Sequence, residues 1–264
     1  MQRSIGIFDS GVGGLTVFHE LMHRLPEENL IYLGDTARVP YGIKSAETVT
    51  RYALEITGFL MKRKIKMLVV ACNTASSVAL PVLQERFPIP VVGVLLPGAR
   101  AAVRDSRVRK VGVIGTESTI GSRAYVQAIH LLDPEVEVHT RACPLFVPLA
   151  EEGWGDHPLT VSIVREYLKD FQETGIDTLV LGCTHYPILR SAIGRVMGEK
   201  VRLVDSATET AREVQALLAS RGLLNKGRRP LTRRYYVTDS PERFRKVGER
   251  FLEQSLSKVE QVAL

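Results

Sequence analysis

Two cysteines each follow a short apolar run, at points where buried strands are expected to end. Cys72 follows residues 68–71 (LVVA), and Cys183 follows residues 178–182 (TLVLG). Apolar runs of this length are typical of strands covered on both faces, and ligands gather at the carboxyl ends of such strands. Because the cysteines are far apart in the sequence, the repeated arrangement indicates two domains that meet, each presenting one thiol.

Two thiols that face one carbon atom from opposite sides can invert its configuration. One thiolate removes a proton from a carbon next to a carboxylate, and the other thiol returns a proton to the opposite face. A free cysteine titrates near ~8.5, so a proton acceptor or a cation must lie nearby, and Asp9 and His185 are the candidates. The resulting carbanion spreads onto the carboxylate, and the hydrogen-bond donors expected to stabilise it are Ser10, Asn73, Thr74 and Thr184.

Other chemistry for these residues is less well supported by their spacing. Cys143 precedes a proline and lacks a comparable polar sequence after it, so we interpret it as a small buried hydrophobic residue. A zinc site of Cys72, Cys183 and His185 is an alternative, but no short ligand spacing favours it. A disulfide oxidoreductase needs a local C-x-x-C motif, which the sequence lacks.

The composition indicates a globular protein of about two domains. The chain has 264 residues, of which 45% are hydrophobic and 24% charged. No run approaches the roughly 20 apolar residues of a membrane helix, and the start shows no signal-peptide pattern. With only three cysteines in the chain, we expect a reduced, cytoplasmic protein with no membrane partner.

The net charge of +6 is concentrated in one segment. Such a basic run is usually a solvated connection, and because no recognition motif accompanies it, contact with nucleic acid is not expected. An anionic small substrate would also favour a positive field. The segment contains Lys226, Arg228, Arg229, Arg233 and Arg234.

Strand and helix patterns alternate along the chain, which predicts an α/β fold of two similar open domains with mostly parallel sheets. A first domain is expected over residues 1–97, joined by the C-terminal segment from about 208 to 264, and a second over residues 98–207. The active site is then expected in the cleft between them. Besides the strands that end at the two cysteines and one that starts at residue 110, strands are expected near residues 4–8, 30–33, 91–96, 136–140, 201–204 and 235–238.

Three local patterns carry further expectations. Residues 9–14 (DSGVGG) predict a turn that lets backbone approach a small carboxylate, although Asp9 and Ser10 could instead cap the helix that follows. Pro97 is expected to end the run at 91–96 and to act as a hinge. Residues 144–153 are expected to be irregular and to lead into two adjacent carboxylates.

Four motifs together resemble the cofactor-independent, two-cysteine aspartate/glutamate racemase family, with the glutamate racemases of bacterial cell-wall synthesis as the specific match. The similarity extends over nearly the whole chain. The motifs are residues 9–16 (DSGVGGLT), 34–42 (GDTARVPYG), 71–75 (ACNTA) and 181–187 (LGCTHYP).

This resemblance implies a role for each motif residue. Cys72 and Cys183 would be the acid/base pair, with Asp9, His185, Asp35 and Glu151 in supporting catalytic roles. Glu152 lies next to Glu151, so either could be the one that faces the site. Leu96 departs from the family, in which many members have an acidic residue before the proline. Substrate contacts would come from Asp9, Ser10, Tyr41, Gly42, Asn73, Thr74, Thr184 and His185.

The expected function is the reversible interconversion of L- and D-glutamate without pyridoxal phosphate, metal or nucleotide, in a homodimer that supplies D-glutamate for peptidoglycan. Two alternatives remain open. The same machinery could racemise aspartate or a related acid, because the sequence does not size the pocket. A non-catalytic protein of the same fold could instead dock an anionic partner through the basic segment, although such a protein would not need both thiols.

Overall fold

The computed structural model describes residues 3–225, 227, 231–256 and 258–264, and these contain two β-sheets in which all paired strands are parallel. The predicted fold class is confirmed. The larger sheet has six strands in the order β10-β9-β2-β1-β3-β4. Its strands are β1 (Ile5–Asp9), β2 (Leu30–Gly34), β3 (Met67–Val70), β4 (Val91–Gly93), β9 (Arg233–Val237) and β10 (Val259–Gln261).

Helices cover both faces of this sheet, which explains the unbroken apolar sequence of its central strands. Ile5 and Ile7 of β1 pack on one face and Phe8 on the other, and all three are fully buried. Full burial of such a side chain contributes about 1.5–3 kcal/mol. One face is covered by α1 (Leu15–Arg24), α12 (Ser206–Ser220) and α13 (Pro241–Leu252), and the other by α2 (Ala46–Lys62), α3 (Asn73–Val78) and α4 (Leu80–Arg86).

The smaller sheet has four strands in the order β6-β5-β7-β8. They are β5 (Lys110–Gly115), β6 (Glu137–Ala142), β7 (Thr178–Gly182) and β8 (Arg202–Asp205). Every residue of β7 is buried, whereas β6, at the edge, is partly exposed along its length. The remaining helices are α5 (Leu95–Asp105), α6 (Glu117–Gly121), α7 (Ala124–Leu132), α8 (Phe146–Glu151), α9 (Pro158–Leu168), α10 (Phe171–Thr174) and α11 (Arg190–Met197), with short 3-10 turns η1 (Tyr41–Ile43) and η2 (Tyr186–Leu189).

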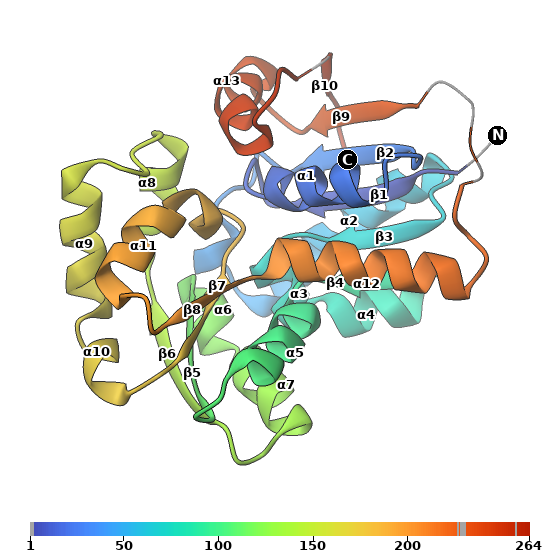
Figure 1. Cartoon of the computed structure of the whole chain (residues 1–264). Helices are drawn as coiled ribbons and strands as arrows, with labels where there is room; N and C mark the ends of the chain where they lie inside the picture. The colour runs from blue at the N-terminus through green and yellow to red at the C-terminus, as the bar shows by residue number, and fades with distance from the viewer. Residues whose placement is uncertain (1–2, 226, 228–230, 257) are drawn as a thin grey trace.

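The chain crosses from the first sheet to the second and then returns. Figure 1 shows the C-terminal elements β9 and α13, in red, lying beside the blue N-terminal elements. Strand β9 pairs with β2, and β10 pairs with β9, so residues near the end of the chain complete the sheet that its beginning starts. We call the six-stranded sheet with its helices the first lobe and the four-stranded sheet with its helices the second lobe.

Two local predictions are wrong. The apolar run at 91–96 is not one strand: β4 ends at Gly93 and α5 begins at Leu95, with Pro97 inside its first turn. Proline is accepted there because the first amides of a helix need no intrahelical acceptor. Residues 144–153 are not irregular throughout, since they contain α8. The predicted domain boundary at residue 97 therefore falls within a helix, and the domain division itself stays a prediction.

Other local predictions are confirmed or lie partly outside the described residues. Ser45 caps α2 by accepting a hydrogen bond from Thr48 N. In the basic segment, Arg233 and Arg234 belong to β9, whereas Lys226, Arg228 and Arg229 lie outside the described residues. None of the helices in the described ranges has the length and apolar character needed to cross a bilayer.

A buried ion pair ties the returning chain to the first lobe. Lys66 Nζ lies 2.6 Å from Glu28 Oε2, and their side chains are only 6% and 2% exposed. Lys66 also donates to Leu223 O and Asn225 Oδ1, while Glu28 Oε1 accepts from Asn225 N. The pair therefore holds the segment that follows α12 against the start of β3.

We expect Lys66→Met to destabilise the protein by about 3–5 kcal/mol, because it leaves the buried Glu28 carboxylate without a counter-charge. Urea unfolding followed by circular dichroism measures this. Lys62→Met, at an exposed position in α2, is the matched control and should change stability by no more than about 0.5 kcal/mol. The Glu28→Gln/Lys66→Met double variant should recover part of the loss, and equal instability of the single and double variants would contradict the assignment.

Candidate functional site

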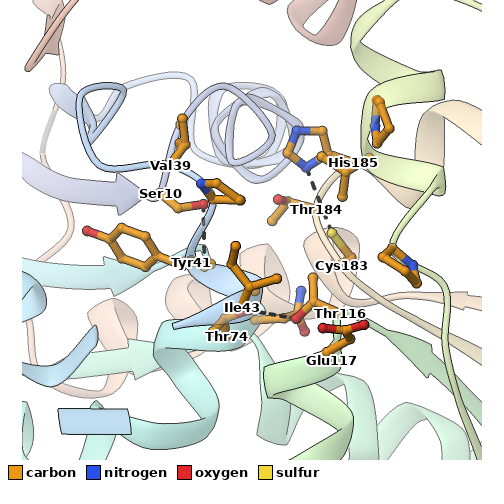
Figure 2. Close-up of a pocket in the computed structure, with 18 of the residues that line it drawn as sticks. Ser10, Val39, Tyr41, Ile43, Thr74, Thr116, Glu117, Cys183, Thr184 and His185 are labelled. Carbon is orange, nitrogen blue, oxygen red and sulfur yellow. Dashed lines mark hydrogen bonds between the residues drawn. The ribbon is translucent and has the colours of Figure 1, made fainter. Parts of the chain in front are cut away.

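A cavity of about 220 Å³ lies between the two lobes, and both predicted reactive cysteines line it. Cys72 comes directly after β3 and Cys183 directly after β7, so the carboxyl ends of strands from both sheets meet here. Figure 2 shows Ser10 and Tyr41 on one side of the cavity and Cys183 and His185 on the other. The volume is below the ~300 Å³ of the smallest pockets for drug-sized ligands, so the cavity suits a small substrate.

Cys72 occupies the N-cap position of α3. Its backbone is extended there, and its sulfur accepts from Ala75 N at 3.5 Å. The Cys72 thiol donates to Ser10 Oγ at 3.8 Å. Burial raises the pKa of Cys72 to about 12, and the negative charge of Asp9 adds to the rise, so the protonated thiol is favoured at neutral pH.

Cys183 begins a chain of polar contacts along the cavity wall. Its sulfur lies 3.8 Å from His185 Nδ1, and His185 Nε2 lies 3.2 Å from Glu151 Oε1. Burial lowers the pKa of His185, but the hydrogen bonds to Cys183 and Glu151 outweigh it and raise the pKa to about 10. The His185 hydrogen bond in turn holds the pKa of Glu151 below its usual range. At neutral pH the site therefore holds an imidazolium next to Cys183.

Asp9 lies behind the cavity wall and joins the two lobes. Its side chain is fully buried; one oxygen accepts from Gly11 N at 2.9 Å and the other from Thr184 Oγ1 at 3.4 Å. Burial raises the pKa of Asp9, while the charge of His185 opposes the rise. The alternative that Asp9 or Ser10 caps the first helix is wrong, because the N-cap of α1 is Gly14 and no side chain caps it.

The glycine-rich turn makes room for protein side chains. A Cβ at Gly13 would lie 2.4 Å from both His185 Nδ1 and Thr184 Oγ1, and one at Gly14 would lie 2.5 Å from the Cβ of Asp9. Gly13 does not line the cavity, although its neighbour Gly11 does. These glycines were expected to let the backbone approach a small carboxylate. That expectation needs correction at Gly13, because the backbone there closely approaches the loop that carries Cys183.

Helix α13 of the first lobe holds Glu151 of the second. Arg243 Nη2 lies 3.4 Å from Glu151 Oε2, and Arg250 Nη1 donates to the Glu151 carbonyl at 3.1 Å. Gly153 has a φ of +76°, and a Cβ there would lie 2.3 Å from Arg250 Nη1, so glycine is needed on both counts. Of the two adjacent carboxylates, Glu151 lines the cavity and Glu152 does not.

The residues after the first cysteine also contact the second lobe. Thr74 Oγ1 lies 2.9 Å from Thr116 Oγ1 and 3.2 Å from Thr119 Oγ1. Asn73 Oδ1 accepts from the Tyr125 hydroxyl at 2.7 Å. Asn73 and Thr74 both line the cavity, as predicted.

Tyr41 and Gly42 line the cavity as well, but Asp35 does not. Asp35 is fully buried behind Tyr41, whose hydroxyl donates to it, and it also accepts from Arg38 and Thr238. The structure thus gives Asp35 contacts that position the loop around Tyr41, and no contact with the cavity. Ser10, Thr184 and His185 complete the set of predicted residues that line it.

Sequence reasoning missed several lining residues. Thr116 and Glu117 follow β5, so the signal that identified the two cysteines, a polar pair after a buried strand, was present there too. The other missed residues are Gly11, Val39, Pro40, Ile43, Pro144, Val147 and Pro148, which form the less polar walls and carry no chemical signature. Within the described residues, no three His, Cys, Asp or Glu side chains gather as metal ligands would.

Substitution of Gly13 should lower the rate of the reaction more than it lowers the stability of the fold. We expect Gly13→Ala to displace His185 and Thr184 and to lower kcat for the expected racemisation by roughly 100-fold, because misplacing reacting groups by about 1 Å costs that much. Gly58→Ala in α2 is the matched control, since a Cβ there meets nothing within 4 Å. Polarimetry with both variants checks this, and an unchanged kcat for Gly13→Ala would contradict it.

The state of His185 should depend on Glu151. Glu151→Gln removes a charged acceptor that favours the imidazolium, so the pKa of His185 should fall below its wild-type value of about 10. If the reaction needs protonated His185, the alkaline decline of kcat/KM should therefore begin at a lower pH in the variant than in the wild type. Proton NMR titration of the imidazole and the pH dependence of kcat/KM measure the two effects. Glu152→Gln is the control, and a shift of equal size in it would argue against a direct effect of Glu151.

The chain is similar in sequence to known racemases. Residues 14–214 match the Asp/Glu/Hydantoin racemase family. Over 262 residues the chain is 59% identical to a glutamate racemase of Geobacter metallireducens, an alignment that covers 99% of this chain and 97% of the relative.

Solved structures give the same result. A glutamate racemase of Bacillus anthracis superposes with a TM-score of 0.95 at 43% identity, covering 99% of this chain and 98% of that one. A glutamate racemase of Francisella tularensis, solved in complex with D-glutamate, superposes with a TM-score of 0.93 at 40% identity and the same coverage. The chain therefore belongs to the Asp/Glu/hydantoin racemase family, among the glutamate racemases.

Proposed function

We propose that the chain interconverts L- and D-glutamate by a two-thiol mechanism in which Cys72 and Cys183 act from opposite faces of the α-carbon. One observation carries this proposal: the two thiols come from different lobes and line the same small cavity. The Francisella tularensis relative binds D-glutamate, which supports glutamate as the substrate. The hydroxyl and amide groups among the lining residues, together with a cationic His185, suit a substrate that carries two carboxylates.

The proton balance of the reaction needs only the two thiols and the substrate. One cysteine, as its thiolate, takes the α-proton, so the C–H bond breaks and an S–H bond forms. The electron pair spreads onto the neighbouring carboxylate. The opposite cysteine, as its thiol, then gives its proton to the other face of the α-carbon and becomes a thiolate, which leaves the enzyme ready for the reverse direction.

Neighbouring residues supply charge and hydrogen bonds for this step. His185 contacts the Cys183 sulfur; as an imidazolium it can give that sulfur a proton, and the neutral imidazole that results can take one back. Cys72 is held as a thiol by burial and by Asp9, and so is prepared to donate. Asn73, Thr184 and Ser10 line the cavity with groups that can donate to the carboxylate as its charge grows. Held between both sulfurs, the α-carbon is already close to its reaction partners.

Two further aspects belong to the proposal. D-Glutamate made in this way would supply peptidoglycan synthesis in the cytoplasm, and the chain would act as a homodimer. The identity of 59% to a curated glutamate racemase supports the cell-wall role. The homodimer stays a prediction, which light scattering of the purified protein tests directly.

Specific observations argue against each of the two alternatives. Aspartate racemisation would use the same thiols on a shorter side chain, whereas the high identities are to glutamate racemases. A non-catalytic binding protein has no need for thiols on both walls of a cavity. Its docking segment would rest largely on Lys226, Arg228 and Arg229, which lie outside the described residues.

Replacing the cysteines one at a time tests the mechanism. Cys72→Ser and Cys183→Ser should each lower kcat by at least about 10²–10⁴-fold, because each removes one acid/base group, and both should keep the fold. Cys143 is fully buried in the hydrophobic core and does not line the cavity, so Cys143→Ser should keep activity close to wild type. Full activity in either of the first two variants would exclude the two-thiol mechanism.

Proton NMR in D₂O tests the function itself. Chelator-treated protein with L-glutamate and no added cofactor should remove the α-proton signal while optical rotation decays. Exchange with aspartate but not glutamate would move the assignment to a sibling racemase. No exchange with either substrate would contradict the proposal and favour the binding-protein alternative.

A further inference from the structure

We propose that Tyr125 of the second lobe is a positioning residue that orients the Asn73 side chain, so that its amide nitrogen donates to the carboxylate of the substrate. This inference deepens the proposed function and rests on it. Tyr125 does not line the cavity and belongs to none of the four sequence motifs. Its role would be exerted entirely through Asn73.

The contact crosses between the lobes. Tyr125 lies in α7, packed on the second sheet, and its hydroxyl donates to Asn73 Oδ1 at 2.7 Å. Asn73 is the first residue of α3 and follows Cys72 directly. The hydrogen bond is buried at both ends, since Tyr125 and Asn73 are each only 2% exposed.

A carboxamide has one acceptor end and one donor end, so fixing one end decides what the other offers. With Oδ1 occupied by Tyr125, Asn73 Nδ2 remains buried and has no hydrogen-bond partner among the residues that the structure describes. A buried donor without an acceptor is unfavourable. Because Asn73 lines the cavity, a substrate carboxylate is an acceptor that can satisfy Nδ2. The opposite orientation would turn Oδ1 toward that carboxylate, which is repulsive.

Tyr125 is itself held firmly enough to set this orientation. A Cβ at Gly182 would lie 3.2 Å from Tyr125 Cε2, and a Cβ at Gly98 would lie 3.2 Å from its hydroxyl. The backbone of β7 and of α5 is therefore packed against the ring. Burial raises the pKa of Tyr125, while a hydrogen bond with Ser206 opposes the rise, so the phenol keeps its proton and remains a donor throughout the working pH range.

Only the arrangement with both lobes in place gives Asn73 this orientation. Asn73 belongs to the first lobe, whereas Tyr125 and Gly182 belong to the second. Tyr125 would thus contribute to carboxylate binding without touching the substrate, by selecting which end of a first-lobe amide faces it.

A double-mutant cycle tests the proposal. Tyr125→Phe keeps the ring and removes the hydroxyl, and it should raise KM for glutamate roughly threefold to tenfold, the loss expected for one neutral hydrogen bond. The pH dependence of kcat/KM should keep its limbs, because no titrating group of the site is altered. In an Asn73→Ala background the same Tyr125→Phe change should alter kcat/KM by less than about 1.5-fold, since the residue it orients is gone.

Equal losses in the two backgrounds would show that Tyr125 acts independently of Asn73 and would overturn the proposal, as would an unchanged KM in the single variant. Tyr235→Phe, a buried tyrosine of β9 that packs on Phe18, is the matched control and should leave KM unchanged. Thermal unfolding of all variants separates loss of fold from loss of binding.

A second measurement avoids the variants. On adding glutamate, the resonances of the Asn73 side-chain amide protons of wild-type protein should move downfield in a ¹⁵N-resolved NMR spectrum, and no movement would overturn the proposal.

Wild-type protein in the same racemisation assay reports on the proposed function separately. Wild-type inactivity would overturn both inferences, whereas an active wild type with an additive cycle would overturn only the role of Tyr125.

Discussion

The close approach of Gly13 to Thr184 and His185 sets the distance between the turn after β1 and the loop that carries Cys183. Any side chain at Gly13 would occupy the space of the His185 ring. With glycine there, Thr184 can reach the buried Asp9 carboxylate, and Thr16 Oγ1 can donate to the Thr184 carbonyl. These contacts fasten the end of β7 to the turn after β1, and so join the two lobes beside the cavity.

Around this contact, acidic and basic side chains lie close together, and the described residues include no group of side chains arranged as metal ligands. His185 is influenced by two carboxylates, Asp9, which is buried behind the cavity wall, and Glu151, which is held by Arg243. At Cys72, in contrast, the charge of Asp9 adds to burial in raising the pKa of the thiol. The two thiols consequently have different electrostatic surroundings, although a reversible reaction uses both. A bound substrate brings an ammonium group and two carboxylates, which can even out this difference.

The sequence predicted the residues whose chemistry is visible in their type and their place after a strand. Cys72, Cys183 and the polar residues that follow them were found in this way, and parallel sheets followed from the alternation of strands and helices. Features that depend on packing between distant segments were not predicted. Nothing local indicates that Gly13 must leave room for His185, that Asp35 lies behind Tyr41, or that Arg243 holds Glu151. Thr116 is an intermediate case, because it and Glu117 follow a buried strand but no cysteine stands beside them. Pro97 was misread because a proline ends strands and begins helices equally well.

The return of the chain to its first sheet has a consequence for synthesis on the ribosome. The four strands of the second sheet come from one continuous stretch, Lys110–Asp205, and can pair as soon as that stretch has emerged. Strand β2 of the first sheet, in contrast, has no partner on one side until β9 appears more than 190 residues later in the chain. During that interval its backbone amides and carbonyls form an open edge on which a neighbouring nascent chain could pair. The lobe that begins first is therefore the lobe that finishes last, and its unfinished edge is the part of the molecule that most needs protection by chaperones.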